Sequence, residues 1–262
     1  MDLGLKNRVA IVAASSQGLG KAVAMGLARE GAILALCART EPALIEAAEE
    51  IRRETGTGVR IRALDVTDHE QVRRFVADIV QEYGRLDICV ANAGGPPSKS
   101  FAETTIEDWH AASNLNLMST VYLAKETLPV MQQRRWGRFI AITSVSVKQP
   151  IEGLILSNAV RSGVNALIKS LANEYGPYNV LVNNVCPGYT ATARLISLAH
   201  TLAEKQGVST KDIEERWASQ TPLRRIGQPE EFASLVVFLA SERASYITGA
   251  SIAVDGGIVK GY

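Results

Sequence analysis

Hydrophobic residues along the chain fall into short runs that alternate with longer amphipathic segments. The short runs are mostly continuously apolar, which is typical of parallel strands covered on both faces. They span residues 8–14, 32–38, 59–64, 87–91, 137–143, 180–185 and 251–255. Helix-like segments lie between them, near residues 18–30, 42–55, 68–83, 105–133, 154–175 and 229–241. The alternation predicts an α/β fold, in which helices cover both faces of a doubly wound parallel sheet of about seven strands.

One segment, residues 189–228, interrupts this rhythm. Its pattern predicts two short helices after the carboxyl end of a strand, where a lid over a substrate is expected. An apolar face of this segment either packs on its own domain or forms a wall over a substrate. The face consists of Leu195, Ile196, Leu198, Ala199 and Leu202. No linker or repeat divides the sequence, so residues 1–262 are predicted to form a single domain.

Net charge and residue composition exclude several classes of binding partner and of site. The 262 residues carry a net charge of +1, which argues against nucleic acid or an anionic membrane as the main partner. The sequence shows neither a signal peptide nor an apolar run long enough to predict a membrane span. Cys37, Cys89 and Cys186 are scattered, which indicates buried inert thiols and a cytoplasmic location. The three histidines are isolated and lack metal-ligand spacing, so no metal site is predicted.

The turn after the first strand has the composition of a phosphate-binding loop. It reads AASSQGLG over residues 13–20, and Gly18 and Gly20 open the following helix. Small residues allow backbone N–H groups to approach a phosphate, and the helix N-terminus favours negative charge. The position of the turn between a first strand and a first helix predicts a dinucleotide site.

Two side chains at the next strand ends bear on which dinucleotide binds. Arg39 follows the second strand, where an acidic residue would commonly bind the ribose 2′-OH of NAD. A cation there suits the 2′-phosphate of NADP, although a solvated surface arginine is the alternative. Asp65 ends the third strand and could accept a hydrogen bond from the adenine amino group. Its alternative role is the cap of the next helix, for which Asp68 is better placed.

These motifs together resemble the short-chain dehydrogenase/reductase family, over about residues 5–258. The matching stretches are AASSQGLG (13–20), LDVTD (64–68), ANAG (91–94), NLNL with Asn116, ITSVS with Ser144, CPG (186–188) followed by Thr190 and Thr192, and ITGASIAVDGG (247–257). Within the family, the chain resembles the β-ketoacyl-acyl-carrier-protein reductase-like group. The resemblance implies a single Rossmann domain, a nicotinamide cofactor, hydride transfer to or from a carbonyl or alcohol carbon, and a homotetramer or homodimer.

The resemblance also implies the cofactor site. NADP(H) is the preferred cofactor, with NAD(H) as the alternative. Asn92 is expected to tie neighbouring strand ends, and Gly94 to leave room for the cofactor. The implied cofactor-binding residues are Ser15, Ser16, Gly18, Leu19, Gly20, Arg39, Asp65, Val66, Asn92, Ala93, Gly94, Arg161, Pro187, Gly188, Thr190 and Thr192. The chain departs from the family at Ala14, where the turn usually has glycine; alanine fits there if its φ stays negative.

A second departure lies in the catalytic residues. The family uses Asn, Ser, Tyr and Lys, with Tyr-x-x-x-Lys on one helix. Asn116 and Ser144 match, although Asn116 could instead be a kink or hydrogen-bonding residue of a long helix. The tyrosine is expected thirteen residues after the serine, which is Ser157, and the lysine position is Arg161. The predicted catalytic set is therefore Asn116, Ser144, Ser157 and Arg161.

These replacements change the available chemistry. A serine hydroxyl is a far weaker acid than tyrosine, whose pKa is about 10, but it can still donate a hydrogen bond to an oxyanion. Arginine keeps the positive charge and can hold ribose hydroxyls, but it does not relay a proton as lysine can. A water molecule or another side chain would then supply the proton. Tyr189 is the candidate side chain, and packing in the lid hinge is its alternative role.

Three interpretations stay open at this stage. The protein is an NADP(H)-dependent oxidoreductase with altered proton delivery, acting on a small carbonyl or alcohol compound that includes the 3-oxoacyl type. Alternatively, it is a catalytically impaired dinucleotide-binding sensor or partner subunit. In the third interpretation, cofactor binding is weak and the fold serves assembly. Arg194, Arg224 and Arg225 in the lid-like segment are further candidates for binding an anionic tail or carrier.

Overall fold

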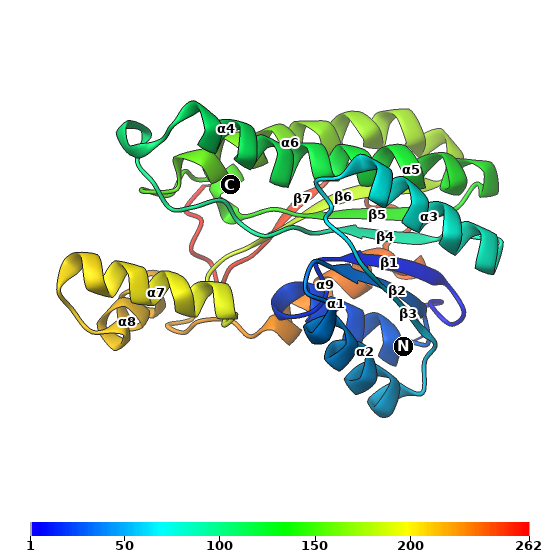
Figure 1. Ribbon diagram of the computed structural model, residues 1–262, viewed down its shortest axis with the longest axis horizontal. Coiled ribbons are helices and arrows are strands. Elements are labelled where there is room, and N and C mark those ends of the chain that lie inside the picture. The colour runs from blue at the N-terminus through cyan, green and yellow to red at the C-terminus, as the bar shows by residue number, and fades with distance from the viewer. Residues whose placement is uncertain (1, 262) are drawn as a thin grey trace.

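Seven parallel strands form one sheet in the computed structural model, which describes residues 2–261 (Figure 1). The sheet order is β3-β2-β1-β4-β5-β6-β7. The strands are β1 (Val9–Ala13), β2 (Ile33–Ala38), β3 (Val59–Ala63), β4 (Ile88–Ala91), β5 (Gly137–Ile142), β6 (Val180–Pro187) and β7 (Ser251–Val254). Each of them falls on one of the apolar runs in the sequence, so the predicted parallel sheet is confirmed.

Helices cover both faces of this sheet. Helices α1, α2 and α9 pack on one face, and α3, α5 and α6 on the other (Figure 1). The helices are α1 (Gly18–Arg29), α2 (Glu41–Thr55), α3 (His69–Tyr83), α4 (Ile106–Ala112), α5 (Ser119–Arg134), α6 (Ile155–Tyr175), α7 (Ala193–Gln206), α8 (Thr210–Gln220) and α9 (Pro229–Ala240). The doubly wound architecture expected from the alternation of strands and helices is therefore present.

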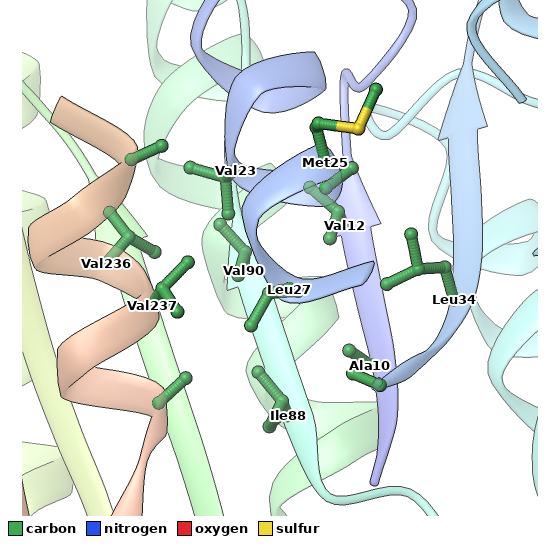
Figure 2. Close-up of a cluster of buried hydrophobic side chains, with 14 of the residues drawn as sticks. Ala10, Val12, Val23, Met25, Leu27, Leu34, Ile88, Val90, Val236 and Val237 are labelled. Atoms are coloured by element: carbon green, nitrogen blue, oxygen red, sulfur yellow. The ribbon is translucent and has the colours of Figure 1, made fainter. Parts of the chain in front are cut away.

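The strands are apolar throughout because both of their faces are buried. Along β1, Ala10 and Val12 belong to the core on the face covered by α1 and α9, and they lie beside α1, near Met25 and Leu27 (Figure 2). Val9 and Ile11, which alternate with them, belong to the core on the opposite face. A side-chain period of two, with both sets buried, produces a continuous apolar run in the sequence.

The predicted helix over residues 105–133 is present, but it is not a regular α-helix throughout. A π-helical segment, Ser113–Met118, separates α4 from α5. The wider turn of a π-helix shifts the side chains that follow it relative to a regular helix, and such segments are frequent at functional sites. Asn116 lies within this segment.

Residues 189–228 contain two helices, α7 and α8, as the sequence predicts. These helices extend beyond the sheet (Figure 1) and enclose a small apolar core of Ala199, Ala203, Ile213 and Trp217. The apolar face predicted for this segment is wrong at Ile196, which is 51% exposed and therefore does not join that core. The packing of α7 on α8, rather than on the sheet, determines which of its side chains are buried.

The structure also bears on two other predictions, that the cysteines are buried and that no segment spans a membrane. Cys37, Cys89 and Cys186 are buried and free, as predicted. Within residues 2–261, no helix is both long enough and apolar enough to cross a membrane.

The strand order places a crevice at one edge of the sheet. The order reverses between β1 and β4, since β2 and β3 lie on one side and β5, β6 and β7 on the other. Ligands of open α/β sheets bind at the carboxyl ends of the strands beside such a reversal. The turns after β1 to β6 therefore meet at the place where the predicted site residues lie.

Candidate active site

A cleft of about 390 Å³ opens at the carboxyl edge of the sheet. It is lined by the turns that follow β1 to β6 and by the start of α7. Among the predicted site residues, its lining includes Ser16, Gly18, Leu19, Arg39, Asp65, Val66, Asn92, Ala93, Gly94, Ser144, Ser157, Arg161, Pro187, Gly188, Thr190 and Thr192. Ser15, Gly20 and Asn116 lie behind this lining, and the contacts below show how they support it.

The turn after β1 adopts a shape that the sequence did not predict. Ala14 has a φ of +47°, so the condition under which alanine would fit this turn without strain is not met. The turn packs closely on Gly20 at the start of α1. A Cβ at this position would lie 2.3 Å from the Ala14 carbonyl oxygen and 2.9 Å from Asn92 Nδ2, so the close approach requires glycine. Asn92 donates hydrogen bonds to the carbonyls of Ala13 and Ala14, each at 3.3 Å. The left-handed conformation of Ala14 is therefore fixed by close contact with α1 and by the end of β4.

Ser15 supports the same turn from beneath. It is fully buried, and its hydroxyl donates a 3.4 Å hydrogen bond to the carbonyl of Cys37 at the end of β2. Ser15 and Gly20 thus determine the shape of the loop without lining the cleft, whereas Gly18 and Leu19 line the cleft directly.

The far end of the cleft contains Arg39 and Asp65. Arg39 is exposed directly after β2. Asp65 accepts hydrogen bonds from the backbone N–H and hydroxyl of Thr67, each at 2.9 Å. Asp68 caps α3 by accepting from the Gln71 N–H, as predicted. Asp65 is therefore not the helix cap, and its contact with an adenine amino group stays a prediction.

Arg161 connects the ends of two central strands. Its guanidinium donates to the carbonyls of Thr143 at 2.8 Å, Ile142 at 3.2 Å and Gly94 at 3.3 Å. Burial, with a further contribution from the charge of Arg194, lowers the pKa of Arg161 to about 10, so it remains a cation at neutral pH. The planar fork of arginine reaches three carbonyls at once, which a lysine ammonium cannot do with the same geometry.

Three serines lie together at the start of α6 and the end of β5. Ser144 Oγ accepts a 3.1 Å hydrogen bond from the Ser146 backbone N–H. The hydroxyls of Ser146 and Ser157 are 3.5 Å apart. Ser146 was missed as a site residue, although its place in the ITSVS stretch, two residues after Ser144, offered a signal. Ser144 and Ser157 line the cleft, and Ser146 lies behind Ser157.

Asn116 shares a partner with Arg161. Its Nδ2 donates a 2.8 Å hydrogen bond to the Gly94 carbonyl, which also accepts from Arg161. Its Oδ1 is buried and has no hydrogen-bond partner among the residues that the structure describes. A buried acceptor of this kind calls for a water molecule or a ligand. The proposed alternative, a hydrogen-bonding residue at a helix irregularity, also describes Asn116 correctly.

Tyr189 does not line the cleft. Its ring stacks on Trp217 with centroids 5.0 Å apart, and its hydroxyl donates to Gln220 Oε1 at 3.2 Å. The suggestion that Tyr189 supplies a proton is therefore wrong, because its hydroxyl points to α8. The alternative role of packing in the lid hinge is the one that the structure shows.

The start of α7 closes one side of the cleft. Arg194, Leu195 and Leu198 line it. Arg194 Nη2 donates a 2.6 Å hydrogen bond to the carbonyl of Pro96, in the loop that follows β4. Farther along α7, Lys205 pairs with Glu103 of the same loop at 3.0 Å. Both contacts hold α7 against the opposite rim.

Comparison with known proteins agrees with this arrangement. Residues 13–259 match the family model described as enoyl-(acyl carrier protein) reductase. The chain is 33% identical to the 3-oxoacyl-[acyl-carrier-protein] reductase FabG of Aquifex aeolicus, with 98% of this chain and 100% of that protein covered. It is 31% identical to the NADPH-dependent reductase BacG of Bacillus subtilis, with 98% and 99% covered. The crystal structure of L-sorbose reductase from Gluconobacter frateurii, complexed with NADPH and L-sorbose, superposes with a TM-score of 0.95 at 35% identity and covers both chains completely.

Proposed function

Because this chain belongs to the short-chain dehydrogenase/reductase family, we propose that it is an NADP(H)-dependent oxidoreductase acting on a small carbonyl or alcohol compound. The observation that carries the proposal is the gathering of the predicted cofactor and catalytic residues around one cleft. The NADPH named for the L-sorbose reductase structure and for BacG supports the choice of cofactor. The FabG relative supports a 3-oxoacyl compound as one candidate substrate.

The donor groups of the cleft fit a 2′-phosphorylated dinucleotide. Gly18 at the start of α1 leaves the backbone open for a diphosphate, and the N-terminus of that helix favours its charge. Arg39 offers a cation at the end of β2, where a 2′-phosphate would lie. The unpartnered Asn116 Oδ1 and the free space beside Gly94, where an added Cβ meets nothing within 4 Å, also suit a ligand.

The catalytic end of the cleft stabilises negative charge instead of delivering a proton. When bound, NADP(H) supplies or accepts the hydride. Ser144 and Ser157 donate hydrogen bonds to the substrate oxygen, and the buried charge of Arg161 stabilises the alkoxide that develops there. In the described part of the chain, the titratable residues that line the cleft are Arg39, Asp65, Arg161 and Arg194, and none of them is an acid at the catalytic end. Water therefore supplies the proton, and Asn116 Oδ1, behind the cleft lining, is a free acceptor for a buried water molecule.

A second function deserves a test because Arg161 already has three protein partners. Its bonds to Gly94, Ile142 and Thr143 would stabilise the cleft even if no hydride were transferred. The protein would then be a dinucleotide-binding sensor or partner subunit. The homotetramer or homodimer and the cytoplasmic location stay predictions, and sedimentation velocity tests the former.

The first experiment is a fluorescence titration of the purified protein with NADPH and NADH in parallel. Binding of NADPH at micromolar concentration, with weaker binding of NADH, supports the cofactor assignment. Turnover of a carbonyl panel with NADPH then separates the enzyme from the sensor. NADPH binding without turnover of any compound would favour the sensor, and binding of neither cofactor would contradict both.

Two serine variants sharpen the assay. Ser157→Ala should lower turnover about tenfold or more, because one hydrogen bond to the developing oxyanion is lost. Ser162→Ala is the matched control, since Ser162 lies on the same helix but is exposed and donates to the Asn158 carbonyl. Equal turnover in the two variants would remove Ser157 from the mechanism.

A further inference from the structure

Two guanidinium groups reach the catalytic end of the cleft without a carboxylate beside them. Arg161 and Arg194 both line the cleft, and their hydrogen bonds go to backbone carbonyls. Within residues 2–261, neither of them forms an ion pair. Asp65 is the carboxylate that lines the cleft in this part of the chain, and it lies at the opposite end, after β3.

The two cations lie close enough to affect each other. Arg161 donates to the Gly94 carbonyl, and Arg194 donates to the Pro96 carbonyl two residues farther along the same loop. The charge of Arg194 lowers the pKa of Arg161, in addition to the larger effect of burial. Like charges in a partly buried site raise the free energy of the protein, and an anion between them would offset this cost.

Arg194 differs from Arg161 in how firmly it is held. Arg161 is 7% exposed and is fixed by three carbonyls, whereas Arg194 is exposed and has one backbone partner, the Pro96 carbonyl. A neutral carbonyl is a weaker acceptor for a guanidinium than a carboxylate, which accepts two parallel hydrogen bonds. Arg194 can therefore exchange Pro96 for an anionic ligand.

Apolar residues line the cleft near Arg194. Pro96 accepts its hydrogen bond, Leu195 and Leu198 follow it on α7, and Leu115 and Leu154 also belong to the cleft lining. Such walls suit a short hydrocarbon body, and Arg194 is the charged side chain next to them. The chemistry of the lining thus matches a compact molecule with one anionic group.

We propose that Arg194 is the anion-binding residue of the substrate subsite, and that it selects carbonyl compounds carrying a carboxylate a few bonds from the reacting carbon. This inference rests on the proposed oxidoreductase function for its substrate. The same guanidinium chemistry would suit a phosphate, including the diphosphate of the cofactor, and the experiment separates these sources.

The test uses the full chain saturated with NADP⁺, so that binding is measured without turnover. Calorimetric titration compares 2-oxobutanoate, 3-oxobutanoate and 4-oxopentanoate, each with its methyl ester, which has nearly the same shape but no charge. At least one acid should bind about ten- to a hundredfold more tightly than its ester, the size expected for a charge-assisted hydrogen bond. Arg194→Gln should reduce that ratio to near one.

Arg224→Gln is the matched control. Arg224 belongs to the same lid-like segment but is exposed and donates to the Ser219 carbonyl, outside the cleft lining. The acid-to-ester ratio should keep its wild-type value in this variant. The affinity for NADPH is measured in parallel for both variants.

The outcomes separate this inference from the proposed function. Acids that bind no better than their esters, or not at all at millimolar concentration, overturn the anion subsite even if the esters are reduced. An Arg194→Gln variant that loses NADPH affinity about tenfold but keeps the acid-to-ester ratio would make Arg194 a cofactor diphosphate ligand and overturn it as well. Tight acid binding without any turnover would support the subsite and contradict the enzyme.

Discussion

Replacing Ala14 with glycine should stabilise this protein, although glycine usually destabilises. Ala14 has a φ of +47°, in the left-handed region that favours glycine. A non-glycine residue pays about 1–2 kcal/mol for this conformation. Glycine also lowers stability by about 0.4–1 kcal/mol because it gives the unfolded chain more freedom. The difference predicts that Ala14→Gly raises the free energy of unfolding by about 0.8 kcal/mol.

The surroundings of Ala14 support this sign. Its carbonyl accepts from Asn92 and lies where a Cβ on Gly20 would clash, so the turn cannot relax to a negative φ without breaking those contacts. Ala14 lines the cleft and is only half-buried, so removal of its methyl group should leave no cavity in the core. Relief of backbone strain is therefore the main effect of the substitution on the folded state.

Urea unfolding monitored by circular dichroism measures this change. It is done at one protein concentration because association would shift the apparent stability. The midpoint of thermal unfolding should rise by about 2–3 °C for a chain of this size. Ala22→Gly is the control, since Ala22 is equally half-buried but lies inside α1, where glycine should cost about 1 kcal/mol. If both variants lose stability by similar amounts, the argument from the φ of Ala14 fails.

Three other predictions concern the cleft. Arg39→Ala should reduce the preference for NADPH over NADH by about ten- to a hundredfold, because a charge-assisted hydrogen bond to the 2′-phosphate is lost. Parallel titrations with the two cofactors measure this preference, and an unchanged value would show that Arg39 does not determine it. Arg161→Ala should lower the free energy of unfolding by about 2–4 kcal/mol, because it removes three hydrogen bonds from a buried guanidinium to the carbonyls of Gly94, Ile142 and Thr143, and should also weaken NADPH binding. Urea unfolding and fluorescence titration check the two effects, and an equally stable variant would contradict the role of Arg161 in connecting these strand ends. The turnover of a saturating carbonyl substrate should be flat between about pH 6 and 9 and fall as Arg161 loses its proton near its lowered pKa of about 10, whereas an acid limb near neutral pH would reveal a titrating proton donor.

The sheet could be predicted from the sequence because its signal is local. Val9 to Ala13 are apolar on both faces of one strand, and that pattern follows directly from burial between two helix layers. The turn that we predict to bind phosphate could also be recognised from the sequence, because it lies between the first strand and the first helix and Gly18 begins that helix. Both features depend on neighbouring residues along the chain.

The features that sequence reasoning missed depend on contacts between distant segments. The positive φ of Ala14 is fixed partly by Asn92, which lies 78 positions away. The side chain of Tyr189 points away from the cleft because its ring stacks on Trp217 and its hydroxyl donates a hydrogen bond to Gln220. A side chain's direction follows from such partners, and one sequence does not show which partners the fold brings together.

The sequence predicts Ser157 and Arg161 at the family's tyrosine and lysine positions, and we interpret the two replacements as one structural change. Arg161 has enough donors to hold Gly94, Ile142 and Thr143 together, and Asn116 holds the Gly94 carbonyl from the other side. A lysine in the same place has its three N–H donors on one nitrogen, whereas Arg161 reaches Ile142 and Thr143 from Nη1 and Gly94 from Nη2. Under the proposed function, serine in place of tyrosine removes the side-chain acid, while the Ser157 hydroxyl and the buried Arg161 cation still line the cleft where the substrate oxygen would lie. Such a site favours charge stabilisation over proton transfer, and this is why the pH dependence of turnover distinguishes it from a site with tyrosine and lysine.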